Sequence, residues 1–180
     1  METNIVAIIQ ARMEASRLPG KMMLPLHGIP VVEWVFRRIK KAKSIQNIVF
    51  AIPDTTSNDI LSDYLKKIGA TVYRGSEKDV VERFCFAARE SNATHIVWIC
   101  VDNPFVSGSE IDRFVQFYLE SDCNYACNHI PKNNCYPDGI GAEIVSLQTL
   151  RDIHEEARSP VTIASMFLIL SGLILEYPSW

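Results

Sequence analysis

The chain has 180 residues, of which 48% are hydrophobic and 22% are charged, with a net charge of −3 at pH 7. This length suits one domain with a buried core, which excludes disordered, collagen-like and low-complexity proteins. The slightly acidic balance also argues against a protein that coats nucleic acid, because such proteins are normally basic. We therefore expect one domain over residues 1–180 and no nucleic-acid partner.

Apolar runs alternate with helical patterns along the chain. The run Ile5–Ile9 is continuous, as is typical of a parallel strand buried on both faces. Pro19 and Gly20 interrupt residues 10–29, and Pro30 can then begin a helix with apolar residues at helical spacing. Further strands are expected at residues 48–52, 70–73, 96–101, 124–127 and 140–145, with helices at about 57–68, 76–91, 109–119 and 147–157.

Two of the expected helices have candidate capping residues at their first turns. Thr56 or Ser57 is expected to cap the helix that follows the second strand. Ser76, with Asp79 three residues further on, is expected to cap the helix that runs to about Ser91. The repeated strand–helix units predict an α/β fold with right-handed crossovers.

In such sheets, ligands bind where the carboxyl ends of the strands meet. Three features fall there: the loop of residues 10–21 after the first strand, the turn of residues 74–76, and Asp102 after the fourth strand. Their convergence predicts a binding site at this edge of the sheet.

The first of these loops has the composition of an anion-binding loop. Arg12, Arg17 and Lys21 place three cations within ten residues, and Gly20 allows a close approach of the backbone. Guanidinium groups and a lysine match the oxygens of a triphosphate, which carries about four negative charges. Glycine-rich phosphate-binding and dinucleotide-binding motifs are absent from the sequence. Charge alone is equally compatible with an exposed loop that binds nothing.

A second group of cations, residues 37–43, has a structural interpretation. Eight of the 18 basic residues lie within residues 1–43, against three acidic ones, and five of the eight fall in this short stretch. Cations near the carboxyl end of a helix are favoured by its dipole, so we expect a solvated helix face here.

The loop ARMEASRLPGK, from Ala11 to Lys21, resembles the signature loop of sugar cytidylyltransferases. This family includes the CMP-Kdo and acylneuraminate cytidylyltransferases. Within it, the chain most resembles the branch of spore coat polysaccharide biosynthesis protein F-like proteins. Other matching stretches follow in order at residues 74–84, 102–104 and 136–143. The resemblance extends from residue 4 to about residue 162.

The resemblance implies a Rossmann-like, mostly parallel sheet of the nucleotide-diphospho-sugar transferase type. The implied reaction transfers CMP from CTP to an acidic or modified sugar and releases pyrophosphate, in surface polysaccharide or glycoconjugate synthesis. Arg12, Lys21 and Asp102 would act in catalysis, with Asp102 also binding Mg²⁺. The nucleotide-binding residues would be Gln10, Ala11, Arg12, Ser16, Arg17, Lys21, Gly75 and Ser76, and the sugar would lie beside Asp138 and Glu143.

The sequence also departs from the family pattern. Glu14 lies between the cations of the loop, where it is expected to weaken anion affinity. Residues 159–175 carry no charge and stand where relatives continue toward an acidic segment, so we expect a domain truncated after about residue 162. We interpret this apolar stretch as a core or interface segment rather than a membrane anchor. Two alternatives remain: a glycosyltransferase of the same fold that uses nucleotide sugars, and a catalytically impaired homologue.

The number and spacing of the cysteines indicate the cellular compartment of the protein. There are five, an odd number with irregular spacing, and the first residues lead directly into an apolar strand pattern. We therefore expect reduced thiols in a cytoplasmic protein, for which a homodimer is one of the allowed states.

Overall fold

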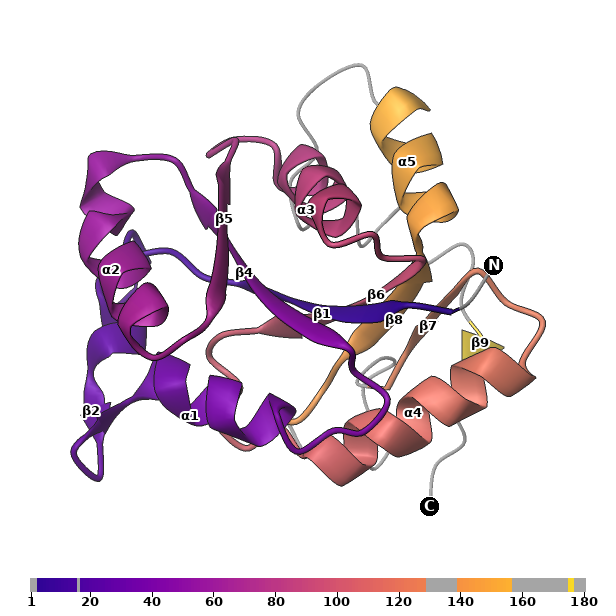
Figure 1. The fold of residues 1–180 in the computed structure, drawn as a ribbon, viewed down its shortest axis with the longest axis horizontal. Coiled ribbons are helices and arrows are strands. Elements are labelled where there is room, and N and C mark those ends of the chain that lie inside the picture. The colour runs from indigo at the N-terminus through magenta and orange to yellow at the C-terminus, as the bar shows by residue number, and fades with distance from the viewer. Residues whose placement is uncertain (1–2, 16, 129–138, 157–174, 177–180) are drawn as a thin grey trace.

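The computed structural model describes residues 3–15, 17–128, 139–156 and 175–176, in which a seven-stranded sheet lies between two layers of helices (Figure 1). In spatial order the strands are β5 (Thr71–Gly75), β4 (Asn47–Pro53), β1 (Ile5–Gln10), β6 (His95–Cys100), β8 (Glu143–Ser146), β7 (Tyr125–Cys127) and β9 (Leu175–Glu176). The helices are α1 (Val31–Ile39), α2 (Asp59–Lys67), α3 (Val80–Glu90), α4 (Gly108–Glu120) and α5 (Leu147–Glu156), with short 3-10 turns η1 (Lys21–Met23) and η2 (Thr56–Asn58). A hairpin of β2 (Pro25–Leu26) and β3 (Ile29–Pro30) stands apart from the sheet.

The sheet is mostly parallel, as expected. Strands β5, β4, β1 and β6 run parallel to one another, whereas β8 runs antiparallel to both β6 and β7. The α/β, Rossmann-like class predicted from the sequence is therefore confirmed.

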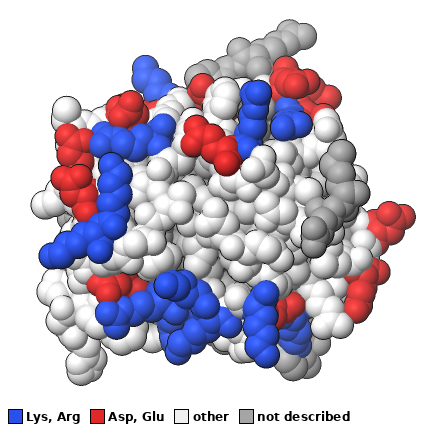
Figure 2. All heavy atoms as spheres, viewed as in Figure 1, with Lys and Arg blue, Asp and Glu red and all other residues white. Residues whose placement is uncertain are grey.

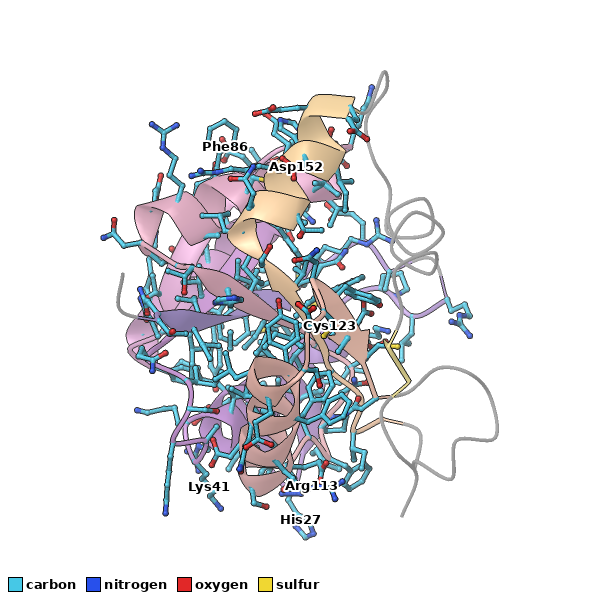
Figure 3. The ribbon with its side chains drawn as sticks, turned by 90° about the vertical axis from the view of Figure 1, so that its right-hand side faces the viewer. His27, Lys41, Phe86, Arg113, Cys123 and Asp152 are labelled. Atoms are coloured by element: carbon cyan, nitrogen blue, oxygen red, sulfur yellow. The ribbon has the colours of Figure 1, made fainter. Side chains whose placement is uncertain are left out.

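Helices cover both faces of the sheet. Buried residues of α1, α2 and α4, such as Val32, Leu61 and Phe114, share one apolar core, and those of α3 and α5, such as Phe84 and Ile153, share the other. The view turned by 90° shows Arg113 of α4 and Asp152 of α5 on opposite sides of the sheet (Figure 3). Two buried faces explain why the central strands are continuous apolar runs.

The central strand β1 positions the first functional residue. All six of its side chains are buried, and its last residue, Gln10, pairs with Ala51 of β4 and Cys100 of β6. The strand thus carries a polar side chain to the carboxyl edge of the sheet, where the chain turns into the loop of residues 11–20.

The helix starts differ from the sequence prediction in two places. Asp79, rather than Ser76, caps α3, because its carboxylate accepts a hydrogen bond from the Glu82 amide at 2.9 Å. The Ser76 hydroxyl instead accepts from the Asp79 amide at 3.0 Å and tightens the preceding turn. Thr56 and Ser57 lie inside η2, so neither of them caps α2.

Strand β8 begins later than expected and runs in the reverse direction. It starts at Glu143 instead of residue 140, and its register pairs Glu143 with Trp98 of β6. Because the two strands are antiparallel, the start of β8 lies near the carboxyl end of β6. The Asn103 side chain, just beyond β6, donates a hydrogen bond to the Gly141 carbonyl at 3.2 Å.

No helix within the described part of the chain is long and apolar enough to cross a membrane. Most of the apolar stretch 159–175, including the expected truncation point near residue 162, lies outside the described residues, so its interpretation stays a prediction.

Candidate active site

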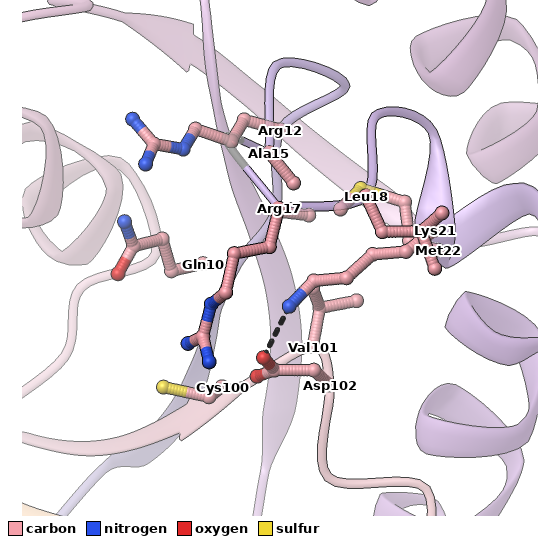
Figure 4. A pocket seen from close by; sticks show the side chains of 11 residues that line it. Gln10, Arg12, Ala15, Arg17, Leu18, Lys21, Met22, Cys100, Val101 and Asp102 are labelled. Carbon is pink, nitrogen blue, oxygen red and sulfur yellow. Dashed lines mark hydrogen bonds and ion pairs between the residues drawn. The ribbon is translucent and has the colours of Figure 1, made fainter.

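A cavity of about 230 Å³ opens at the carboxyl ends of β1 and β6 (Figure 4). Its walls come from the loop after β1, from η1 and from the residues that end and follow β6. The lining residues are Gln10, Ala11, Arg12, Ala15, Arg17, Leu18, Lys21, Met22, Cys100, Val101 and Asp102. Six of the residues assigned to the site from the sequence therefore line one cavity: Gln10, Ala11, Arg12, Arg17, Lys21 and Asp102.

The charges around this cavity are unbalanced. Three of the four charged lining residues are cations. Among the described residues, Lys21 is the one of these cations with an ion-pair partner, since its ammonium nitrogen lies 2.5 Å from Asp102 Oδ2. Within the described part of the chain, the guanidinium groups of Arg12 and Arg17 make no hydrogen bond or ion pair. In Figure 4 the Arg17 side chain extends toward Cys100, and the Arg12 side chain extends in a different direction, above Gln10. The cavity is thus suited to a multiply charged anion.

The loop that presents these cations is fixed by backbone hydrogen bonds. The Met13 carbonyl accepts from the amides of Ala15 and Gly20 at 3.0 and 2.8 Å, which folds the loop back on itself. Gly20 adopts a φ of +68°, a left-handed conformation that residues other than glycine rarely adopt. The Met13 amide donates to Asn58 Oδ1 at 2.9 Å, and Asn58 is fully buried. These contacts tie the loop to the start of α2.

Glu14 is directed away from the loop cations. Its carboxylate accepts hydrogen bonds from the Ser57 hydroxyl and from the Asn58 side-chain amide, the latter at 3.2 Å. The residue therefore anchors the loop to η2, and the weakened anion affinity expected from the sequence stays a prediction.

Asp102 has the donor chemistry that Mg²⁺ requires. Its side chain is 50% exposed at the cavity mouth, and magnesium ordinarily takes one or two carboxylates together with phosphate oxygens and water. Among the described residues no group of three or more His, Cys, Asp and Glu side chains could enclose a metal ion. The arrangement fits a metal that is held largely by its substrate, with one protein carboxylate.

The turn after β5, which the sequence assigned to nucleotide binding, does not line the cavity. Gly75 and Ser76 are absent from the cavity wall, and the Ser76 carbonyl accepts a hydrogen bond from Nη1 of Arg83. Arg83 comes from the first turn of α3 and is 1% exposed. Burial lowers the pKa of Arg83 to about 10, with a further lowering by the positive charge of Arg12 and an opposing effect of the Asp79 carboxylate.

Glu143 is buried behind the cavity rather than exposed in it. It is 5% exposed and accepts a hydrogen bond from the Tyr125 hydroxyl at 2.8 Å. Burial raises the pKa of Glu143 to about 8, against the lowering effect of the Tyr125 hydrogen bond, and burial also raises the pKa of Tyr125. The remaining predicted site residues, Ser16 and Asp138, lie outside the described residues.

The second group of cations has structural partners. Arg37 forms an ion pair with Glu33 at 2.5 Å, Arg38 donates to the Pro104 carbonyl at 2.8 Å, and the Lys40 ammonium lies 5.3 Å from the Phe36 ring centre. Figure 2 shows basic side chains along the lower edge of the molecule, over α1 and the connection after it. These contacts agree with the helix-face interpretation, because none of the cations lines the cavity beside Asp102.

Sequence reasoning missed three residues that shape the site. Asn58 carried no signal, because its bond to Met13 joins segments 45 residues apart. The sequence did contain a signal for Arg83, because this charged residue falls on the face of α3 on which Val80, Phe84 and Ala87 are buried. Cys100 lines the cavity as a neutral thiol, because burial raises its pKa to about 12.

Proteins of known name are similar to this chain in sequence. The chain is 34% identical over 156 residues to spore coat polysaccharide biosynthesis protein SpsF of Bacillus subtilis (strain 168), covering 83% of this chain and 62% of that protein. It is 28% identical over 120 residues to a 3-deoxy-manno-octulosonate cytidylyltransferase of Bdellovibrio bacteriovorus, covering 65% of this chain and 47% of the relative. The chain thus spans less than two thirds of the length of these relatives.

Solved structures and a family model agree with these relatives. A cytidylyltransferase from Leptospira borgpetersenii serovar Hardjo-bovis superposes with a TM-score of 0.89 at 26% identity, over 98% of this chain and 76% of that one. A CMP:2-keto-3-deoxy-manno-octonic acid synthetase complexed with CTP shares the fold, with a TM-score of 0.76 at 15% identity, over 98% of this chain and 90% of that one. The family model described as "Cytidylyltransferase" matches residues 6–160, and the chain therefore belongs to the cytidylyltransferase family.

Proposed function

We propose that this chain transfers CMP from CTP to a sugar and releases pyrophosphate. The observation that carries the proposal is the convergence of Arg12, Arg17 and Lys21 with Asp102 around one cavity in a member of this family. A triphosphate would supply the negative charge that these cations lack.

The proposed reaction forms one bond and breaks one bond at the α-phosphorus of CTP. A sugar hydroxyl oxygen attacks this phosphorus and releases its proton to water, and the bond to the oxygen that bridges to the β-phosphate breaks, so pyrophosphate leaves with additional negative charge. The guanidinium of Arg12 and the ammonium of Lys21 would stabilise this charge, while Arg17 would orient the phosphates. Catalysis would rest on positioning and electrostatics, without a covalent intermediate on the protein.

Asp102 is the residue we propose to hold Mg²⁺. The ion would supply positive charge that offsets the negative charge of the phosphates. The ion pair between Lys21 and Asp102 would then separate, which frees the ammonium group for a phosphate oxygen.

We further propose an acidic or modified sugar as acceptor and a role in surface polysaccharide synthesis. The names of the relatives, a spore coat polysaccharide protein and 3-deoxy-manno-octulosonate cytidylyltransferases, support both. Glu143 and Asp138 remain our candidates for the sugar side. The free thiols of Cys85, Cys100 and Cys127 suit a reducing compartment, so we propose the cytoplasm. The homodimer stays a prediction.

The experiment is a panel of substrates. Purified protein with Mg²⁺ is incubated with each nucleoside triphosphate and a set of sugars, including Kdo and neutral sugars, and pyrophosphate release is followed. We expect release with CTP and a restricted group of sugars. Retained CTP binding without release on any sugar would instead support an impaired homologue.

A further inference from the structure

Gln10 carries a buried side-chain oxygen that makes no hydrogen bond. The residue ends β1 and is 9% exposed, and its Oε1 atom has no hydrogen-bond partner among the described residues. An amide oxygen that is removed from water without a donor costs free energy, which a donor on a bound ligand would recover. Buried polar atoms are paired in most proteins, so this oxygen needs a physical explanation.

The register of the sheet places this amide at the candidate active site. The five residues before Gln10 in β1 are apolar, and strand alternation puts Gln10 on the same face as Val6 and Ile8. Its register partners, Ala51 of β4 and Cys100 of β6, are small and leave room beside it. Gln10 and Cys100 both line the cavity of about 230 Å³. The unpartnered oxygen thus belongs to a residue of the cavity wall.

The phosphates of a nucleotide do not satisfy this oxygen. Arg12, Arg17 and Lys21 carry only donors, which suit phosphate oxygens. A phosphate oxygen without a proton is itself an acceptor, so it cannot donate to Gln10. In Figure 4 the Gln10 amide lies apart from the Lys21–Asp102 pair, on the side toward which Arg12 extends. The oxygen therefore needs a proton-bearing group on another part of the ligand.

A nucleoside offers such groups directly beside its phosphates. Cytidine has an amino group on the base and hydroxyl groups on the ribose, and each of these donates hydrogen bonds. Because the nucleoside is joined to the α-phosphate, its donors stay close to the cavity wall when the loop cations hold the phosphates.

We propose that Gln10 is a specificity-determining residue, whose Oε1 accepts a hydrogen bond from the nucleoside part of the bound nucleotide. The inference rests on the proposed function, in which that nucleotide is CTP. A buried acceptor favours ligands that bring a donor and disfavours those that lack one. Binding by the loop cations depends on phosphate charge, and Gln10 adds a dependence on the nucleoside.

The test compares nucleotides with a phosphate chain that has no nucleoside. Affinities for CTP, UTP, 2′-deoxy-CTP and inorganic triphosphate are measured by calorimetry in the presence of Mg²⁺. Gln10→Met removes the amide from an unbranched side chain of similar length, and Gln10→Glu keeps acceptor oxygens in nearly the same volume. Gln116→Met, at an exposed glutamine of α4, is the matched control.

For Gln10→Met we expect the affinity for CTP to fall by about tenfold, because the nucleoside donor loses its acceptor. The affinity for inorganic triphosphate should not change. Gln10→Glu should keep the ratio of these two affinities, because its negative charge acts on both ligands alike, and Gln116→Met should keep both affinities. Unliganded Gln10→Met should unfold at or above the wild-type temperature, because an unpaired buried oxygen has been removed.

The other two nucleotides identify the donor. If Gln10→Met abolishes a preference for CTP over UTP, the donor is the amino group of cytosine, which uracil lacks. A loss for CTP and UTP that 2′-deoxy-CTP does not share assigns the bond to the 2′-hydroxyl of ribose. An equal loss for all three nucleotides assigns it to the 3′-hydroxyl, which they have in common.

Unchanged CTP affinity in Gln10→Met would overturn the inference. So would an equal loss for CTP and inorganic triphosphate, because the side chain would then act on the phosphates or on the shape of the cavity. A ratio that falls as far in Gln10→Glu as in Gln10→Met would also contradict it. The proposed function fails by a different result, the absence of pyrophosphate release from CTP with any sugar. Binding needs no turnover, so the two failures are distinguishable.

Discussion

At the scale of single residues, Lys21 and Asp102 neutralise one another at the mouth of a cavity whose other charged lining residues are Arg12 and Arg17. Both partners are partly exposed, with 33% and 50% of their side chains accessible, so the pair contributes little to the stability of the fold. This exposure leaves both residues free to exchange partners when a substrate and a metal ion arrive.

Replacing Lys21 by alanine tests this exchange. We expect Lys21→Ala to lower kcat/KM for CTP by about a hundredfold, because one preorganised charge on the leaving group is lost. The unfolding temperature should stay close to that of the wild type. Lys41→Ala, which removes an exposed lysine after α1, is the control and should keep full activity. If Lys21→Ala matched the parent in kcat/KM, the role assigned to the loop would be wrong.

Glu143 gives the fold a specific dependence on pH. Its pKa rises from 4.5 to about 8 on folding, so the folded state holds the proton more tightly than the unfolded state. The resulting stabilisation is complete below the unfolded pKa and is lost as the pH rises through about 8. Glu143→Gln imitates the protonated form at every pH.

Thermal unfolding between about pH 5 and pH 9 measures this effect. The wild type should lose stability across the range, and Glu143→Gln should lose less of it, with the difference largest at the alkaline end. Glu77→Gln, an exposed residue, should follow the wild type. Parallel curves for wild type and Glu143→Gln would show that Glu143 is charged in the folded protein at neutral pH.

At the scale of secondary-structure elements, α4 approaches the end of α1 with unusually little space. A Cβ on Gly108 would lie 2.7 Å from the Ala42 amide nitrogen and 2.8 Å from the Lys41 carbonyl carbon. These neighbours are backbone atoms, so the two elements would have to separate to accept a side chain.

Gly108→Ala is therefore expected to destabilise the protein by about 1–3 kcal/mol, the range typical of overpacking. The sign is opposite to helix propensity, which favours alanine over glycine by about 1 kcal/mol. Chemical denaturation measures the change, with Ser109→Ala at the next position as a near-neutral control. A stabilised Gly108→Ala protein would mean that the close approach does not exist in solution.

The start of α3 offers a second test at this scale. Asp79→Ala should cost about 1 kcal/mol of unfolding free energy, because the bond from its carboxylate to the Glu82 amide is lost. Glu77→Ala removes an acidic residue from the same turn without a capping bond and should cost much less. Equal costs would assign the effect to charge rather than to capping.

The sequence predicted which segments form strands and helices more accurately than it predicted the residues at which they begin and end. The buried run Ile5–Ile9 and the spacing of Val32, Val35 and Ile39 gave a strand and a helix that the structure confirms, since burial on defined faces is a periodic signal. Ser76 and Asp79 are both acceptable caps by residue type, and only the local geometry decides between them.

The candidate site likewise has residues that the sequence could assign and tertiary contacts that it could not. The cations of the loop and Asp102 could be assigned because they follow strands in the sequence, and strand ends meet in such sheets. The anchoring of the loop by Asn58 and the burial of Glu143 beside Tyr125 depend on tertiary contacts between distant segments, which leave no local pattern.

At the scale of the whole molecule, a net charge of −3 conceals a strongly cationic cavity. Acidic residues elsewhere on the surface repel phosphates at long range, whereas the unpaired guanidinium groups attract them at short range. Binding of a nucleotide should therefore depend on its phosphate charge and weaken as salt rises, because salt screens exposed charges.

The most direct test of this account is a calorimetric series with cytidine, CMP, CDP and CTP on the wild-type protein in the presence of Mg²⁺. The account predicts affinity that rises with each phosphate, is highest for CTP, and falls with added salt. Equal affinity for CMP and CTP, or no binding of CTP, would contradict the claim that the cavity of Arg12, Arg17 and Lys21 is a triphosphate site.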